Sequence, residues 1–120
     1  MDLNLKDKVV LVTGGSKGIG YAISHVLAAE GAIPFIISRN EKSILKAVEE
    51  ISEKGGKCSF AVAELTDPDQ CKASVQKAIS EFGTIHALVN NAGVNDSVGL
   101  ENGDEDTFIL SLKKNVVHFF

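Results

Sequence analysis

The chain has 120 residues, which is the size of a single domain. Hydrophobic residues make up 44% of it and charged residues 23%, so it can bury a packed core and is not expected to be disordered. The net charge of -4 gives no general basic field for nucleic acid, and no stretch approaches the ~20 apolar residues of a membrane span. The polar residues 1–7 do not resemble a signal peptide, so we expect a cytoplasmic protein.

In the first part of the chain, segments typical of buried strands alternate with a segment of helical spacing. Residues 8–13 (KVVLVT) predict a first strand, and residues 32–38 (AIPFIIS) predict a second, although Pro34 cannot donate to a sheet. A helix is expected between Gly18 and Gly31. The apolar residues on its predicted inner face are Ile19, Ala22, Ile23, Val26 and Leu27.

The same alternation continues along the chain. Asn40 is a candidate cap for a second helix, which Gly55 and Gly56 would end. Asp67-Pro68-Asp69-Gln70 predicts the start of a third helix, since it combines a capping carboxylate with proline in the first turn. Further strands are expected at 57–63 and 85–90, a polar loop at 93–106 and a last helix at 107–120. The residues expected on the buried helix faces are Ile44, Leu45, Val48, Ile51, Cys71, Val75, Ala78, Ile79, Phe82, Phe108, Leu112, Val116 and Phe119.

Strands that alternate with helices of this length indicate an α/β fold with a parallel sheet, wound by right-handed crossovers. The runs at 8–13 and 32–38 are nearly continuous in apolar character, as expected for strands covered on both faces. Cys58 and Cys71 lack metal-ligand spacing, so we expect reduced thiols and no metal site.

The turn between the first strand and the first helix is rich in glycine, with the spacing GxxxGxG over residues 14–20. Gly14 allows a sharp turn, Gly18 removes a side chain where a phosphate would approach, and Gly20 allows close helix packing. The free N–H groups at the start of the helix favour an anion. The segment therefore predicts a phosphate-binding loop rather than a simple turn.

Two motifs together resemble a known family. TGGSKGIG (residues 13–20) is similar to the cofactor motif of the short-chain dehydrogenases/reductases, and NNAG (residues 90–93) is similar to their second signature. The resemblance covers the whole chain and implies a doubly wound, Rossmann-type sheet in the order 3-2-1-4. It also implies that residues 1–120 are the N-terminal, nucleotide-binding part of an incomplete domain, whose fifth strand would follow Phe120.

The resemblance assigns a nicotinamide dinucleotide to the strand ends. The pyrophosphate would lie on the glycine loop, and the ribose end would be read after the second strand. The predicted loop contacts are Gly14, Ser16, Lys17, Gly18, Ile19 and Gly20. No acid follows the second strand, where Ser38 and Arg39 stand instead, so NADP is expected in preference to NAD. The alternative is that Lys17 and Arg39 are solvated cations, with Arg39 paired to Glu41.

Further along the chain, the resemblance implies contacts to both ends of the dinucleotide. Glu64 stands where the family usually has Asp, and together with Leu65 it would read the adenine. The predicted contacts to the nicotinamide-side ribose are Asn91, Ala92 and Gly93. Asn90 would instead tie neighbouring strands together.

The family's chemistry uses Asn, Ser, Tyr and Lys, and only one of the four has a match here. Asn115 matches the Asn, which holds a water for proton transfer. Tyr21 is the sole tyrosine and has no Lys four residues later, so the Ser and the Tyr-x-x-x-Lys pair are absent. We therefore expect the 120-residue chain alone to be inactive.

The segment after NNAG suggests a substrate class. NNAGVNDSVGL is similar to family members that oxidise aldoses such as L-fucose to lactones, and Asn95 and Asp96 are candidate partners of sugar hydroxyls. Two alternatives remain open: a 3-oxoacyl reductase, and a nucleotide-binding or interaction module without catalysis. As partners we expect a small molecule, a second copy of the complete chain, or a missing C-terminal half.

Overall fold

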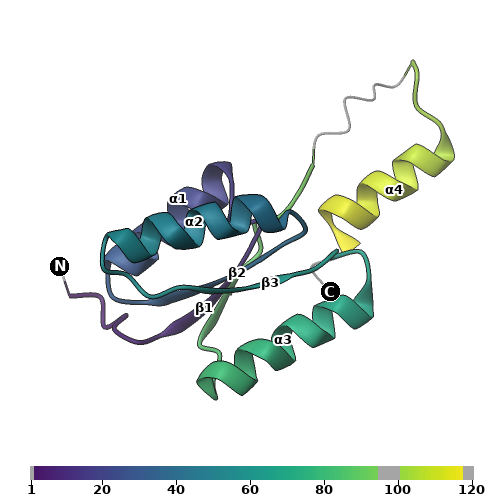
Figure 1. Ribbon diagram of the computed structural model, residues 1–120. Helices are drawn as coiled ribbons and strands as arrows, with labels where there is room; N and C mark the ends of the chain where they lie inside the picture. The colour runs from purple at the N-terminus through teal and green to yellow at the C-terminus, as the bar shows by residue number, and fades with distance from the viewer. Residues whose placement is uncertain (1, 95–100, 118–120) are drawn as a thin grey trace.

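The computed structural model of the chain describes residues 2–94 and 101–117, and strands alternate with helices along it (Figure 1). The elements are β1 (Val9–Thr13), α1 (Gly18–Ala29), β2 (Ile33–Ser38), α2 (Glu41–Glu53), β3 (Ser59–Val62), α3 (Pro68–Phe82), β4 (Ala87–Val89) and α4 (Glu105–Asn115). The strands form one parallel sheet in the order β3-β2-β1-β4. The predicted Rossmann-type α/β fold and its strand order are confirmed.

Pro34 lies inside β2, which pairs with a strand on each side. Its missing N–H costs the sheet no hydrogen bond. The N–H of Ile33 donates to the carbonyl of Lys8 at 2.8 Å, on the β1 side of the strand. Successive residues of a strand point their N–H groups to opposite sides, so the nitrogen of Pro34 faces away from β1. On that side β3 begins to pair only at Phe35, which lies opposite Ser59. Proline is therefore tolerated at this one position of the strand.

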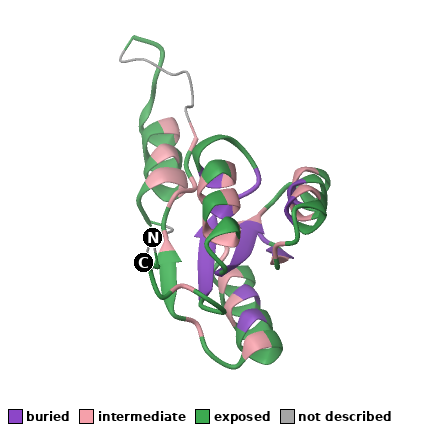
Figure 2. Cartoon of the chain, turned by 90° about the vertical axis from the view of Figure 1, so that its left-hand side faces the viewer, coloured by how far each residue is buried: buried purple, intermediate pink, exposed green. Residues whose placement is uncertain are grey.

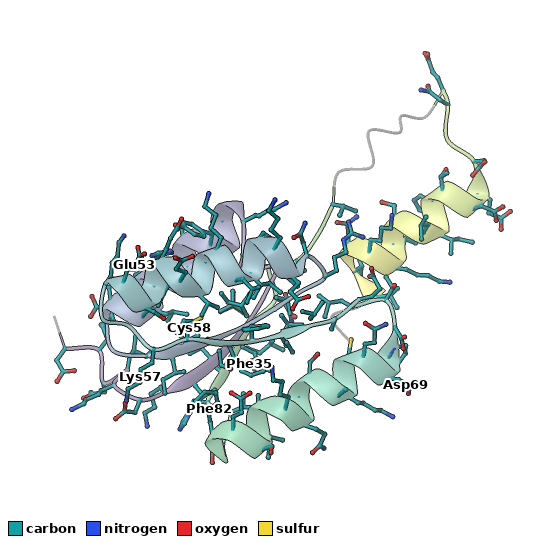
Figure 3. All side chains as sticks on the ribbon, in the orientation of Figure 1. Phe35, Glu53, Lys57, Cys58, Asp69 and Phe82 are labelled. Carbon is teal, nitrogen blue, oxygen red and sulfur yellow. The ribbon has the colours of Figure 1, made fainter. Side chains whose placement is uncertain are left out.

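Helices cover both faces of the sheet, with α1 and α2 on one face and α3 on the other (Figure 1). Phe35 lies on the α3 side, where its ring meets that of Phe82 edge to face, with 6.4 Å between the centroids (Figure 3). On the opposite face, Ile36 packs with Ile44 and Ala47 of α2. The buried residues accordingly gather in the central strands (Figure 2). This double burial explains the continuous apolar runs in β1 and β2.

The face that α1 turns to the sheet agrees only in part with the one expected. Its buried residues are Gly20 and Ser24, whereas Ile19 is 75% exposed and Val26 63% exposed. The Ser24 hydroxyl donates to the carbonyl of Gly20 at 3.0 Å, which satisfies it inside the helix. Small residues thus allow the helix backbone to approach the sheet. Ile23 and Leu27 pack against the core as expected, whereas Ile19 and Val26 point outward. Other expected core residues are also exposed, namely Leu45, Ile79, Phe108, Leu112 and Val116.

The helix starts follow local capping chemistry. Asp67 caps α3 as expected, accepting from the Asp69 N–H at 3.0 Å, but the Gln70 side chain accepts from Glu64 N–H instead of closing a capping box. The helix α4 begins at Glu105, two residues before the predicted start, because Asp104 and Thr107 form a reciprocal capping box. It ends at Asn115, short of the predicted end; residues 118–120 are outside the described residues.

Within the described residues, no helix combines the length and apolar character needed to cross a membrane.

The packing of α2 on the sheet gives a test with an adjacent control. Ile44 is fully buried and Leu45 is 47% exposed. We expect Ile44→Ala to lower the free energy of unfolding by about 2–5 kcal/mol, since it leaves a cavity under the helix. Leu45→Ala should cost well under half as much. Urea unfolding followed by circular dichroism measures both; equal losses would contradict the described orientation of α2.

Candidate functional site

A cleft of about 380 Å³ lies at the carboxyl ends of the strands, where loops from all four strands meet. Ten of the predicted cofactor residues line it: Gly14, Ser16, Lys17, Ser38, Arg39, Glu64, Leu65, Asn91, Ala92 and Gly93. Parallel strands bring these residues together because all their carboxyl ends reach the same edge of the sheet. The other predicted residues of the glycine loop, Gly18, Ile19 and Gly20, do not line this cleft.

The glycines of the loop are required for two reasons, backbone conformation and close packing. Gly14 has φ +67° and Gly18 has φ +55°, both in the left-handed region. A Cβ atom on Gly20 would lie 2.2 Å from the Gly14 carbonyl oxygen, so no side chain fits there. A Cβ on Gly18 would meet no heavy atom within 4 Å, which leaves open space over the start of α1. Gly20 is therefore required by packing, and Gly18 by backbone conformation.

The start of α1 differs from the starts of the other helices. The side chains of Asn40, Asp67 and Asp104 each accept a backbone N–H at the start of α2, α3 and α4. At α1 the cap residue is Lys17, and its side chain makes no such bond in the described structure. The N–H groups at the start of α1 thus keep their capacity to donate to an anion.

Thr13 and Asn91 join the glycine loop to the loop that follows β4. The Thr13 hydroxyl accepts from the N–H groups of Asn91 at 3.0 Å and Ala92 at 3.1 Å, and it donates to the Val89 carbonyl. The Asn91 carboxamide donates to the carbonyls of Thr13 and Gly14 at 3.2 and 3.3 Å. Asn91 therefore has the strand-tying role that the sequence assigned to Asn90, and its backbone also lines the cleft.

Hydroxyl groups from three elements meet beside the tip of β2. The hydroxyl oxygen of Ser16 lies 3.3 Å from that of Ser38 and 3.1 Å from that of Ser43. Ser43 was not predicted; its signal was its position three residues after the cap Asn40, in the first turn of α2. The cluster gives the cleft several donors next to the Lys17 and Arg39 backbone.

Arg39 pairs with Glu64 rather than with Glu41. The guanidinium lies 3.6 Å from the Glu64 carboxylate, and the two side chains are 60% and 39% exposed. Partial burial raises the pKa of Glu64, but hydrogen bonds from Thr66 and the charge of Arg39 lower it by more, so the pKa lies below its usual value. Glu64 is therefore a carboxylate at neutral pH, held at the mouth of the cleft.

Asn115, the predicted catalytic residue, lies at the end of α4 and holds the loop after β4. Its side-chain oxygen accepts from the Val94 N–H at 2.7 Å, and its amide donates to the Ser111 carbonyl at 3.0 Å. It does not line the cleft, whereas its neighbour Lys114 does. The predicted substrate residues Asn95 and Asp96 lie outside the described residues.

The only tyrosine does not lie in the cleft. Tyr21 is on α1, and its hydroxyl donates to Glu50 of α2, beside the ring of His25. The hydrogen bond to Glu50 raises the pKa of Tyr21, with smaller contributions from burial and the carboxylate charge. A phenol acting as a general base needs the opposite shift.

The cleft-lining residues that the sequence did not indicate are Ile37, Asn40, Ser43, Ala63, Thr66, Val94 and Lys114.

Comparison with known proteins identifies the family. The family model for short chain dehydrogenases matches residues 8–120. The chain belongs to the short-chain dehydrogenase family. Members of this family are oxidoreductases that use NAD or NADP. The glycine loop and NNAG of this short-chain dehydrogenase therefore occupy the matched region, at the strand ends described above.

Named relatives of this short-chain dehydrogenase act on different substrates. A 3-oxoacyl-[acyl-carrier-protein] reductase of Chlamydia muridarum is 40% identical over 108 residues, which are 88% of this chain and 44% of the relative. A probable galactose dehydrogenase of Rhizobium meliloti is 33% identical, covering 98% of this chain and 46% of the relative. L-sorbose reductase of Gluconobacter frateurii, solved with NADPH and L-sorbose, superimposes with a TM-score of 0.92 at 28% identity, over 99% of this chain and 46% of that one. The chain thus spans about half the length of the proteins it matches.

The Thr13 hydroxyl gives a test of how this short-chain dehydrogenase holds its cleft together. Thr13→Val keeps the shape of the side chain, but the N–H groups of Asn91 and Ala92 lose this acceptor. We expect the free energy of unfolding to fall by about 1–3 kcal/mol, since two part-buried N–H groups lose a hydrogen bond to this hydroxyl. Thr13→Ser retains the hydroxyl and should recover most of the loss. Thermal unfolding compares the two; equal destabilisation would assign the effect to packing instead.

Proposed function

We propose that this chain is the nucleotide-binding part of an NADP-dependent short-chain dehydrogenase. The observation that carries the proposal is the cleft that joins the glycine loop to the tips of β2 and β3 and contains Lys17 and Arg39. When bound, the nicotinamide ring supplies or accepts the hydride. The residues of this chain hold the dinucleotide and orient it, and residues 1–120 are proposed as one incomplete domain.

The described residues fit the phosphate groups of such a cofactor. The uncapped start of α1, with open space at Gly18, suits the pyrophosphate. At the other end, the guanidinium of Arg39, the ammonium of Lys17 and the hydroxyls of Ser16, Ser38 and Ser43 suit a 2′-phosphate. The solved L-sorbose reductase contains NADPH, which supports the same class of cofactor here.

The remaining contacts follow the direction of the cleft. Glu64 and Leu65 are proposed to face the adenine, and Asn91, Ala92 and Gly93 the ribose on the nicotinamide side. Ile19 and Gly20 are proposed to contact the cofactor through the backbone of α1. The Ile19 side chain is exposed, and Gly20 has no room for a side chain. Lys114 adds a third cation to the cleft lining, beside Val94.

Arg39 tests the cofactor assignment directly. Arg39→Ala should weaken NADP binding by about 1–3 kcal/mol, the usual range for a charge-assisted hydrogen bond, and leave NAD binding almost unchanged. Lys42→Ala is a matched control, because it removes a nearby exposed cation that does not line the cleft. Fluorescence titration with NADPH and NADH measures the affinities. Equal losses for both dinucleotides would contradict a 2′-phosphate contact.

Asn115 is proposed to hold the proton-donating water of the family's four-residue relay. Its carboxamide bonds to Val94 and Ser111, which fixes the end of α4 against the loop after β4. No tyrosine lines the cleft within the described residues, and the one tyrosine of the sequence, Tyr21, has no lysine four residues after it. Tyr21 lies between α1 and α2 with a raised pKa, so it does not replace the missing tyrosine.

A sugar hydroxyl is the proposed reaction centre, with an L-fucose-like aldose oxidised to its lactone. The probable galactose dehydrogenase and the L-sorbose reductase among the relatives support a sugar. The 3-oxoacyl reductase at 40% identity supports the alternative of a ketone carried on an acyl carrier protein. Asn95 and Asp96 remain candidates for sugar contacts. In either case a homo-oligomer is proposed, since α4 exposes Phe108 and Leu110.

The 120-residue chain itself should bind the dinucleotide without oxidising a sugar. General acid–base catalysis of this kind typically contributes ~10²–10⁴-fold, and residues 1–120 contain no Tyr-x-x-x-Lys pair. The purified chain is incubated with NADP and L-fucose, D-galactose or, in the reverse direction, NADPH and a 3-oxoacyl thioester. We expect saturable dinucleotide binding and no change in reduced-cofactor absorbance. Turnover would show that other residues of this chain perform the chemistry; absence of binding would reject the nucleotide site.

A further inference from the structure

The mouth of the cleft contains an ion pair that the proposed cofactor has to disturb. Arg39 follows β2 and Glu64 follows β3, and the Ala63 N–H donates to the Ser38 carbonyl at 2.9 Å, which places the two strand tips side by side. The guanidinium of Arg39 lies 3.6 Å from one carboxylate oxygen of Glu64. Both side chains line the cleft.

Glu64 is held toward the cleft by its own neighbours. The carboxylate oxygen of Glu64 that does not face Arg39 accepts from the Thr66 N–H at 3.3 Å and from the Thr66 hydroxyl at 3.1 Å. The backbone N–H of Glu64 donates to the side-chain oxygen of Gln70 at 2.7 Å. One oxygen is therefore used within the loop, and the other faces the guanidinium. A carboxylate fixed in this way does not need to be ordered before it meets Arg39.

We propose that Glu64 is a specificity-determining residue that competes with the cofactor's 2′-phosphate for Arg39. This inference rests on the proposed NADP site. In the free protein the carboxylate occupies one side of the guanidinium, and a 2′-phosphate takes its place. NAD has only a hydroxyl at this position and leaves the pair intact. Glu64 thereby reduces the preference for NADP that Lys17 and Arg39 create.

The magnitude of the effect follows from the exposure of the pair. Ion pairs between partly exposed side chains contribute little, so the competition is a modest correction and not a block. The same carboxylate lies near the proposed phosphate position, where like charges also repel. Glu64→Gln keeps a side-chain oxygen that can accept from the adenine, which both dinucleotides share, and removes the negative charge. It should therefore favour NADP binding over NAD binding.

The test uses the purified protein and four variants: Glu64→Gln, Arg39→Ala, the double variant and Glu41→Gln. Glu41→Gln is the matched control, since it removes the same charge two residues from Arg39 and outside the cleft lining. NADPH and NADH affinities are measured by fluorescence titration. We expect Glu64→Gln to tighten NADPH about two- to fivefold, with less change for NADH and for the control. In the Arg39→Ala background the gain should largely disappear.

The outcomes separate this inference from the function on which it rests. If Arg39→Ala weakens NADPH but Glu64→Gln does not tighten it, the NADP site stands and the competition is overturned. An equal gain in both backgrounds would also overturn it, because repulsion alone would then explain the effect. If Arg39→Ala has no effect on NADPH, the proposed 2′-phosphate site itself fails.

A second readout does not depend on affinity. NADP should raise the pKa of Glu64, followed by carbon NMR of its carboxyl group, because Arg39 is withdrawn from the carboxylate and negative charge is added. NAD should leave the pKa nearly unchanged. Equal shifts with the two dinucleotides would contradict the exchange of partners.

Discussion

At Gly20 the first turn of α1 lies so close to the rest of the molecule that a Cβ atom would be 2.2 Å from the Gly14 carbonyl and 2.5 Å from the Asn91 amide nitrogen. This contact brings the glycine loop and the loop after β4 together, and the Thr13 hydroxyl holds them there. Two of the loops that line the cleft are thereby fixed to the end of β1. The position of the glycine-loop backbone thus depends on the absence of one side chain.

The electrostatics of the cleft set two effects against each other. Lys17, Arg39 and Lys114 bring positive charge to its lining, and Glu64 brings a carboxylate to the same mouth. A carboxylate at the end of β3 can accept a hydrogen bond from a base, but the longer glutamate side chain also reaches Arg39. Because exposed ion pairs are weak, such an arrangement changes the balance between cofactors by a small factor and can be altered by a single methylene.

The described residues define the cleft at the strand ends much better than they define contacts to a substrate. The described cleft is built from strand tips and backbone, which suits a dinucleotide common to a whole family. Relatives that match nearly all of the chain are named for an acyl ketone in one case and for a sugar in another. Similarity over these residues therefore does not by itself indicate the substrate.

The sequence by itself determined the parallel α/β fold, because glycine spacing, capping residues and apolar runs act over a few neighbouring positions. The strand order and ten of the cleft residues followed from the resemblance of two motifs, TGGSKGIG and NNAG, to the short-chain dehydrogenases. The sequence was right about Ile23 and Leu27 on the inner face of α1 but wrong about Ile19. Whether Ile19 or Gly20 faces the sheet depends on how closely the helix can approach. The sequence also missed Lys114, which has no local pattern, and Ser43, although Ser43 lies three residues after the cap Asn40. Only the tertiary structure decided that Arg39 meets Glu64 and not Glu41, because that partner lies on another strand and is brought near by sheet pairing alone.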